Sequence, residues 1–340
     1  MSRYFLALAL AGLAAMAAVP ADARSALEAA RERGHFICGL RSETVGFARK
    51  LPDGRVTGFE VDICSAVAIA VAGPSVKLSL VPLAASERLE ALKTGKVDFL
   101  VSGTTLTYTR ETDPDLQFPA IYYFDTQGIM VPRKAGKQRA TELNGFSVCV
   151  TSGTTTEANL ETYFRNNKMT FKPVPVANAE ALRDSFFKGT CQAVTADSSA
   201  LYATRAAYAS NPDEYSILRD FLSKEPLAAV TRADDERFSS IVRWTVAALL
   251  QAEEEGITSR NIDATKASGS ARQRYLLGVT PGIGKPLGLS DDWVYNVVKV
   301  VGNYGEIFER NLGAATPLKI NRGLNTLWNQ GGMMYSPPFN

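Results

Sequence analysis

The strongest constraint on this chain is an alternation of strand-like and helix-like segments that occurs twice along its 340 residues. The first alternation has predicted strands and helices at residues 35–40, 61–72, 76–82, 86–94 and 97–101. The second follows an extended stretch at 122–131 and has predicted elements at residues 146–150, 154–164, 171–176, 179–188, 191–196 and 199–209. Strands that alternate with helices form mostly parallel sheets flanked by helices, so the sequence predicts two α/β units.

The remaining third of the chain is predicted to be helical. Residues 235–255 form a long amphipathic pattern, and shorter helical patterns follow at 291–301 and 304–311. No proline-rich or low-complexity linker separates the two alternating halves. We therefore expect two lobes joined by crossing strands and not two tethered domains.

The N-terminus has the pattern of a cleavable signal peptide. Arg3 precedes an apolar run at residues 4–19, and Ala21-Asp22-Ala23 supplies small residues at the spacing that signal peptidase recognises. The alternative is a membrane anchor, but the run is shorter than the ~20 residues that span a bilayer. We expect cleavage after Ala23, which removes residues 1–23, and export of the mature protein.

Export makes disulfide bonds possible, because they persist in oxidising compartments. The four cysteines are Cys38, Cys64, Cys149 and Cys191, and none of them forms a CxxC motif. Four cysteines allow three connectivities. Pairing in sequence order, with loops of 26 and 42 residues, is only the most economical of these connectivities.

Composition excludes several classes of function. The chain has 37 basic and 35 acidic residues, and a net charge of +2 is too small to indicate a nucleic acid or an anionic membrane surface as partner. The single histidine, His35, lies in an apolar strand, which argues against histidine metal clusters and serine–histidine catalysis. We expect no catalytic residue, no metal and no cofactor.

Polar residues follow three predicted strands, where ligands of open α/β sheets bind. Arg110 ends the segment 102–110 after one strand, and its planar guanidinium matches a carboxylate. Thr154 and Thr155 open a helix, whose free N–H groups attract anions. Asp197 ends a third strand and suits an ammonium group. Together these groups complement the zwitterion of an α-amino acid.

The helix at Thr154 also has a simpler interpretation. Thr154 and Glu157 have the spacing of a capping box, which stabilises a helix without any ligand. Capping and ligand binding are compatible, so both interpretations stay open.

At these residues the chain resembles the family 3 periplasmic solute-binding proteins of ABC importers, in particular the branch that binds L-amino acids generally. The resemblance covers essentially the whole mature chain. Its motifs lie at Gly58–Cys64, Ser102–Arg110, Ser152–Glu157, Ser223–Leu227, Val301–Asn311 and Gly323–Asn329.

The resemblance implies an α/β protein with the two-lobed type II periplasmic binding protein fold, in which each lobe is a mostly parallel sheet with flanking helices. It implies a first lobe at 24–127, a second lobe at 128–222, and a return to the first lobe with a helical C-terminal extension at 223–340. It further implies a monomer in the periplasm, without direct membrane insertion. That monomer would bind an L-amino acid and deliver it to a permease and its ATPase.

The resemblance also assigns roles to individual residues. Arg110 would hold the ligand carboxylate, assisted by Thr105 and Thr155. Asp197 and the backbone at Gly103 would bind the ammonium group. Phe47, from the loop at residues 41–50, would cover the ligand side chain. The cysteine pattern also matches the branch, which supports pairing in sequence order.

One segment departs from the pattern. Similar proteins read Arg-Asn-Thr-Thr-Trp-Thr where this chain has Ser102-Gly103-Thr104-Thr105-Leu106-Thr107. Because an amide becomes Gly103 and an aromatic becomes Leu106, we expect an amino acid ligand without assigning which one. The alternatives are a periplasmic enzyme on the same scaffold, similar to cyclohexadienyl dehydratase with Glu43 or Asp197 as its acid, and a ligand-sensing domain.

Overall fold

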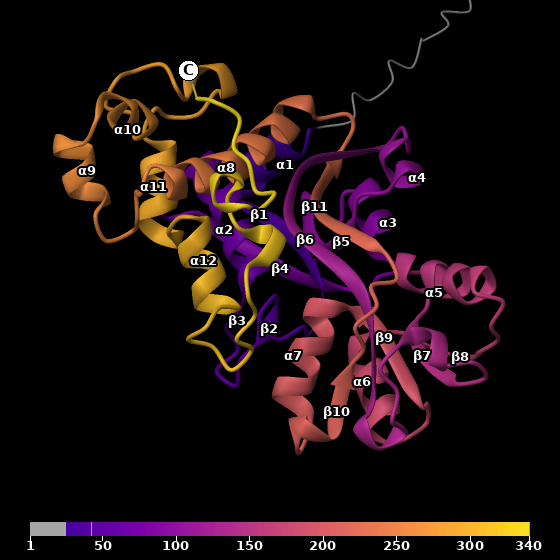
Figure 1. Ribbon diagram of the computed structural model, residues 1–340. Helices are drawn as coiled ribbons and strands as arrows, with labels where there is room; N and C mark the ends of the chain where they lie inside the picture. The colour runs from indigo at the N-terminus through magenta and orange to yellow at the C-terminus, as the bar shows by residue number, and fades with distance from the viewer. Residues whose placement is uncertain (1–24, 42, 340) are drawn as a thin grey trace, which may run out of the picture.

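The computed structural model describes residues 25–41 and 43–339, and Figure 1 shows them as two lobes with strands running between them. The predicted signal peptide lies outside the described residues. The first helix, α1 (Ala26–Arg33), is capped as the sequence predicts. The Ser25 side chain accepts a hydrogen bond from the Glu28 N–H, and Gly34 ends the helix with φ +75°.

The first lobe contains a sheet in the strand order β4-β1-β5-β11-β6. Its strands are β4 (Lys77–Leu83), β1 (His35–Arg41), β5 (Phe99–Thr105), β11 (Lys224–Arg232) and β6 (Leu116–Pro132). The first three are parallel, and β11 is antiparallel to both of its neighbours. Helices of this lobe are α1, α2 (Phe59–Ala72), α3 (Arg88–Lys93), α4 (Tyr108–Glu111) and α8 (Glu236–Glu254). A small hairpin, β2 (Arg49–Lys50) and β3 (Val56–Thr57), precedes α2.

The second lobe repeats the arrangement around the strand order β6-β9-β7-β8. Its strands are β9 (Ala193–Asp197), β7 (Ser147–Thr151) and β8 (Lys172–Val176), with β10 (Tyr215–Ile217) paired to the end of β6. Strand β7 is parallel to both β8 and β9. The helices are α5 (Thr155–Asn166), α6 (Ala179–Phe187) and α7 (Ser198–Tyr208). Both predicted alternations are thus confirmed.

Strand β6 connects the two sheets. Its first half, up to Thr126, pairs with β11 in the first lobe. From Gln127 onward it pairs with β9 and then with β10 in the second lobe. One continuous strand therefore belongs to both lobes, as expected for lobes joined by crossing strands.

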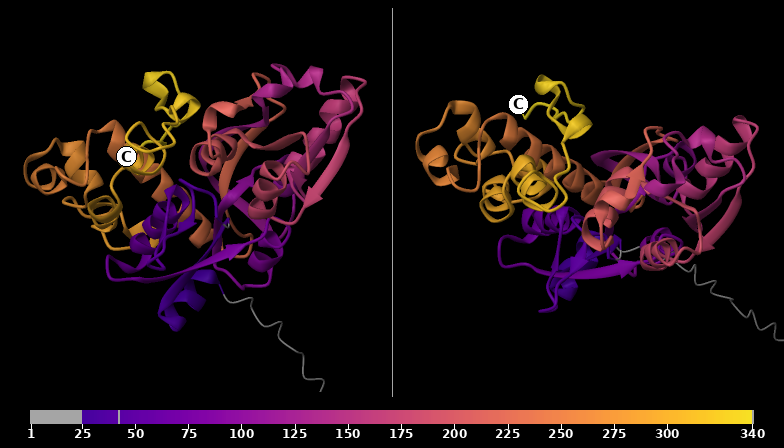
Figure 2. Two further views of the ribbon diagram at one scale, coloured as in Figure 1. Left: turned by 90° about the horizontal axis from the view of Figure 1, so that it is seen from below. Right: turned by 60° about the horizontal axis from the view of Figure 1, so that its bottom comes forward.

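The C-terminal helices pack on the first lobe. They are α9 (Ile262–Ser268), α10 (Ala271–Leu276), α11 (Trp293–Val301) and α12 (Tyr304–Asn311), and Figures 1 and 2 show them on the side of the first lobe that is remote from β7 and β8. Tyr304 and Phe308 pack against Phe59 of α2 in the core. The Asn325 side chain bonds both backbone groups of Phe124, which ties the tail to β6.

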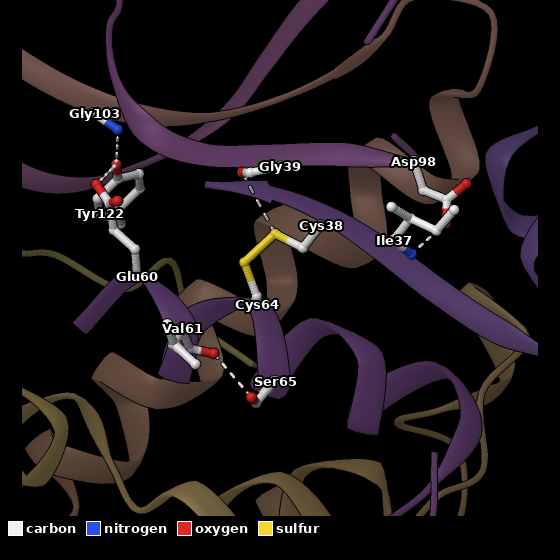
Figure 3. The surroundings of a disulfide bond; sticks show 10 residues. All are labelled: Ile37, Cys38, Gly39, Glu60, Val61, Cys64, Ser65, Asp98, Gly103 and Tyr122. Atoms are coloured by element: carbon white, nitrogen blue, oxygen red, sulfur yellow. Dashed lines mark hydrogen bonds between the residues drawn. A yellow bond between two sulfur atoms is a disulfide. The ribbon is translucent and has the colours of Figure 1, made fainter. Parts of the chain in front are cut away.

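Two disulfides join the cysteines in sequence order, which confirms the predicted pairing. Cys38 of β1 is bonded to Cys64 of α2, as Figure 3 shows. Cys149 of β7 is bonded to Cys191, two residues before β9. Each disulfide links elements of one lobe and leaves the crossing strands unlinked.

One predicted strand boundary is wrong. The sequence predicts that the strand at 97–101 ends before the polar segment, but β5 continues to Thr105. The side chains of Ser102, Thr104 and Thr105 are buried although they are polar, because each has a hydrogen-bond partner there. The hydroxyls of Ser102 and Thr104 bond each other, and the Thr105 hydroxyl donates to the Glu225 carboxylate. These residues are therefore part of the sheet and not of a loop.

Within residues 25–41 and 43–339, no helix is long and apolar enough to cross a membrane.

Removing the second disulfide tests its contribution to stability. Closing a loop of 42 residues reduces the conformational entropy of the unfolded chain. This loss destabilises the unfolded chain by about 4 kcal/mol. We expect the double variant Cys149→Ser, Cys191→Ser to lose up to that free energy of unfolding, measured by guanidinium denaturation. A variant with the denaturation midpoint of the wild type would contradict this expectation.

Candidate ligand-binding cleft

A cavity of about 150 Å³ lies between the two lobes. The first lobe lines it with residues from the ends of β1, β4 and β5 and the start of α3, and the second lobe with residues around β7, β9, α5, α6 and α7. On the same scale, one water molecule needs about 10–15 Å³. The cavity therefore has room for a small organic molecule in contact with both lobes.

Asp197 is the carboxylate of the second-lobe wall. It ends β9 at the cavity, at the carboxyl end of a parallel strand. Burial and the neighbouring carboxylate of Asp125 raise the pKa of Asp197 to about 7, although Arg41 and Arg88 oppose the shift. Asp125 is itself engaged by the backbone N–H and the hydroxyl of Ser199. Asp197 is thus a poorly compensated acid that a cation in the cavity would stabilise.

Arg41 faces Asp197 from the first lobe. It is the last residue of β1, and its Nη1 lies 3.6 Å from Oδ2 of Asp197. Its Nε and Nη2 donate to Oε1 of Glu60 at 2.9 and 2.6 Å. Burial opposes the positive charge, but Glu60, Tyr122 and Asp197 raise the pKa of Arg41 above its ordinary value. Arg41 therefore remains a cation in the cavity wall.

Arg88 is a second buried cation in the first-lobe wall. Its Nη1 donates to the carbonyl oxygens of Ser102 and Gly103 at 2.7 and 3.2 Å, and its Nε has no described partner. Burial, with the charges of Arg110 and Arg41, lowers the pKa of Arg88 to about 10. Arg88 holds the end of β5 in place and adds positive potential to the cavity.

Glu225 connects the lobes at the edge of the cavity. It lies on β11, is only 1% exposed, and accepts a hydrogen bond from Thr105 of the first lobe at 2.5 Å. It also accepts from Asn159 at 2.9 Å and Thr155 at 3.4 Å, both on α5 of the second lobe. The Ser223 hydroxyl is a further donor. Glu225 thereby positions the hydroxyl groups of Thr105 and Thr155, which both line the cleft.

The start of α5 forms part of the second-lobe wall. The Thr154 hydroxyl accepts from the Glu157 N–H, as a helix cap does. The Glu157 carboxylate accepts from the Gly153 N–H and not from Thr154, so the predicted capping box is only half formed. Thr154 and Thr155 nevertheless line the cavity. The capping and ligand-binding interpretations are thus compatible in space.

Five of the seven predicted ligand-binding residues line the cavity: Gly103, Thr105, Thr154, Thr155 and Asp197. The backbone of Gly103 is already engaged, because its N–H donates to the Tyr122 hydroxyl and its carbonyl accepts from Arg88. Figure 3 shows Tyr122 between Gly103 and Glu60. An ammonium group at Gly103 would share its carbonyl with Arg88.

Arg110 is placed beside the cavity and not among its lining residues. It lies on α4, and its Nη1 donates to the carbonyl of Thr105 at 2.9 Å. Burial lowers the pKa of Arg110, and the charges of Glu225 and Asp197 oppose that shift. Arg110 is therefore linked to the cavity wall through Thr105, which lines the cavity.

The prediction for Phe47 needs a correction. Its side chain is 0% exposed and packs edge-on against Phe59 and Tyr123 in the first-lobe core. It does not line the cavity, because Arg41 lies over its ring at 4.6 Å and separates it from the cleft. Phe47 therefore lies in the core behind Arg41 and is not placed to contact a molecule in the cavity.

Sequence reasoning missed three charged groups of the cleft. Arg41 stands at the end of a buried strand, as Asp197 does. Inspection of the polar residue at the end of β1 would therefore have identified Arg41. Glu225 lies in a motif that we noted without assigning a role. Arg88 has no comparable signal, because its function depends on the distance from α3 to the end of β5.

Glu43 also lines the cavity, as the enzyme alternative requires of an acid. In the part of the chain that the structure describes, no three histidine, cysteine, aspartate or glutamate residues are grouped so that they could hold a metal ion.

In comparisons with known proteins, the chain is similar to bacterial solute-binding proteins. The sequence profile of the bacterial extracellular solute-binding proteins, family 3, matches residues 36–275. The chain is 44% identical over 329 residues to the general L-amino acid-binding periplasmic protein AapJ of Rhizobium johnstonii, covering 96% of each chain. It is 42% identical over 339 residues to the glutamate/glutamine/aspartate/asparagine-binding protein BztA of Rhodobacter capsulatus, covering 99% of each.

A solved structure has the same fold. The ABC transporter / periplasmic binding protein from Brucella ovis with glutathione bound superposes with a TM-score of 0.90 at 45% identity, covering 93% of this chain and 99% of that one. The predicted two-lobed α/β fold is thereby confirmed.

The raised pKa of Asp197 predicts a pH dependence of stability. The folded protein keeps a proton up to about pH 7 that the unfolded chain releases near 3.8. The associated stability is fully present below pH 3.8 and is lost as the pH rises through 7. We expect the free energy of unfolding to fall between pH 4.5 and 7.5, and to fall less in Asp197→Asn. An equal slope in both proteins would contradict the shift.

Proposed function

Because the chain belongs to the bacterial extracellular solute-binding proteins of family 3, we propose that it binds an L-amino acid zwitterion between its lobes and delivers it to a membrane permease. The observation that carries this proposal is the cleft, which is lined by Asp197 of one lobe and by Thr105, Arg41 and Arg88 of the other. An ion of either sign alone would leave one of these charged walls uncompensated.

In the proposed complex, the ligand ammonium pairs with Asp197. The ligand carboxylate binds Arg110, the hydroxyls of Thr105 and Thr155, and the start of α5, where Thr154 is the cap. A charge-assisted pair with a planar guanidinium suits a carboxylate, and the helix N-terminus adds to the positive potential. Glu225 supports this arrangement because it holds both hydroxyls.

The names of the similar proteins support an amino acid ligand. AapJ is named for general L-amino acid binding, and BztA for glutamate, glutamine, aspartate and asparagine. The Brucella ovis protein has glutathione bound, a peptide whose γ-glutamyl end is itself an α-amino acid zwitterion. We propose that the zwitterion is the group this cleft recognises, and glutathione belongs in the ligand screen.

The similar proteins are periplasmic binding proteins, and we propose the same location for this chain, reached by cleavage of residues 1–23. The proposed lobes are residues 24–127 with 223–340, and residues 128–222. The lobes would close on the ligand by bending where β6 and β11 cross. The partners proposed are the permease and the ATPase of an ABC importer, and the protein is proposed to act as a monomer.

The enzyme alternative has two observations in its favour, because Asp197 has a pKa near 7 and Glu43 also lines the cavity. The similar proteins are named as binding proteins, and we propose that this chain is not an enzyme. Incubation with prephenate or arogenate decides the question, because any dehydrated product would contradict the proposal.

Titration calorimetry against the twenty amino acids and glutathione tests the proposed function. We expect saturable one-to-one binding of at least one amino acid. A ligand that binds only the folded protein also raises its melting temperature, so a thermal-shift screen gives an independent measurement. Absence of binding by all twenty amino acids would refute the proposal.

Arg110→Ala should weaken the binding of that amino acid by at least about 30-fold, because it leaves a buried carboxylate unpaired. The matched control is Arg55→Ala, which removes a guanidinium whose side chain is 74% exposed and is not among the residues that line the cavity. Unchanged affinity in Arg110→Ala, with its melting temperature preserved, would show that another group holds the carboxylate.

A further inference from the structure

The C-terminal tail, residues 313–339, packs on the first lobe, and none of its residues lines the cavity. Leu327 and Met334 of the tail are buried in the first-lobe core, and the Phe339 ring lies 4.8 Å from the Trp244 ring of α8. Figure 1 shows this tail in yellow, over the first lobe. The family profile ends at residue 275, so the tail lies outside the matched region.

Asn325 of this tail is bonded to the outer edge of β6. In the first sheet β6 is the last strand, and its pairing with β9 begins at Gln127. The Phe124 N–H donates to Oδ1 of Asn325 at 2.6 Å, and Nδ2 of Asn325 donates to the Phe124 carbonyl at 3.0 Å. The Asn325 side chain is 3% exposed. It thus supplies the acceptor and the donor that a neighbouring strand would supply.

Arg322 holds Asn325 in this position. Its Nε and Nη2 donate to the Asn325 carbonyl at 3.1 and 2.9 Å. The same guanidinium pairs with both carboxylate oxygens of Glu253 on α8. It also lies over the rings of Tyr304 and Phe308 on α12. A bidentate pair of this kind fixes the orientation of the guanidinium, so Asn325 is anchored to two helices of the first lobe.

The position that Asn325 holds lies where β6 and β11 cross between the lobes. Phe124 is opposite Pro226, which has no N–H group and whose carbonyl accepts from the Leu106 N–H at 2.9 Å. Both crossing strands are thus bonded on their outer sides to the first lobe. Shortly after Phe124, at Gln127, β6 enters the second sheet. Bending β6 at Phe124 would break both bonds to Asn325, whereas bending it beyond Phe124 would break neither.

We propose that Asn325 is a positioning residue that fixes the first-lobe end of the hinge, so that the lobes move by bending β6 after Phe124. Without these two bonds, β6 would also bend at Phe124, and the lobes would sample a wider range of separations. The inference goes beyond the proposed function, because it concerns the range of lobe movement and not the ligand. It gives the C-terminal tail a role in that movement.

Pulsed electron paramagnetic resonance on the ligand-free protein measures this range. All four native cysteines form disulfides, so spin labels attach at introduced cysteines. Val300→Cys, at a 52% exposed position of α11, labels the first lobe, and Glu161→Cys, at an exposed position of α5, labels the second. In this background Asn325→Leu removes both bonds and keeps a side chain of similar size. We expect it to broaden the distribution of label–label distances about twofold.

The matched control removes a tail contact that does not involve β6. Phe339→Ala deletes the ring that packs against Trp244, and it should keep the width of the wild type. Asn325→Ala removes the same two bonds with a smaller side chain, so it gives the result if Asn325→Leu does not fold. The melting temperature of each variant is measured in parallel, because a contact that only stabilises the fold changes the melting temperature and not the width.

A folded Asn325 variant with the distance distribution of the wild type would overturn the inference, even if its melting temperature is lower. Equal broadening in Phe339→Ala would also overturn it, because the packing of the whole tail, and not Asn325, would then limit the movement. These measurements contain no ligand. Failure of the wild type to bind any amino acid would therefore refute the proposed function without changing either outcome.

Discussion

The hydrogen-bonded pair of β6 and β11 is the part of the molecule on which both lobes depend. β6 pairs with β11 in the first sheet and continues into the second, so one strand belongs to both lobes. On this pair Glu225 lies opposite Asp125, at the level where the lobes meet. Each carboxylate is bonded to groups at the cleft, Glu225 to hydroxyls of both walls and Asp125 to Ser199 beside Asp197. The strands that join the lobes therefore also place the charges of the site.

The pairing of buried charges explains most features of the cleft. A buried charged side chain needs a partner, and the charged side chains of this cleft differ in the partners that they have. Arg41 is compensated by Glu60, and Arg88 is bonded to carbonyl oxygens, whereas Asp197 has the carboxylate of Asp125 beside it and Arg41 at 3.6 Å. The raised pKa of Asp197 reflects its burial and this unfavourable neighbour. A ligand ammonium would add a counter-charge, which is why a zwitterion suits the cleft better than a neutral molecule.

Periodicity and strand-end chemistry predicted the fold and part of the site. The alternating pattern located the parallel strands, because buried runs separated by amphipathic helices are a local signal, and the three strand ends located Asp197 and the threonines. Other features needed the three-dimensional structure. Polar residues extend β5 to Thr105, because Ser102 and Thr104 bond each other and Thr105 donates to Glu225 of β11, which is distant in the sequence. Phe47 is buried because it packs among the aromatic rings of the first-lobe core, with Arg41 over its own ring.

The central claim is that an amino acid zwitterion binds between the lobes with its ammonium group on Asp197. A crystal structure of the complex, prepared with the tightest-binding amino acid at saturating concentration, tests this claim most directly. We predict electron density for the ligand in the cleft, with its nitrogen within about 3 Å of an Asp197 carboxylate oxygen. A ligand bound outside the cleft, or bound in it with the ammonium directed away from Asp197, would contradict the account.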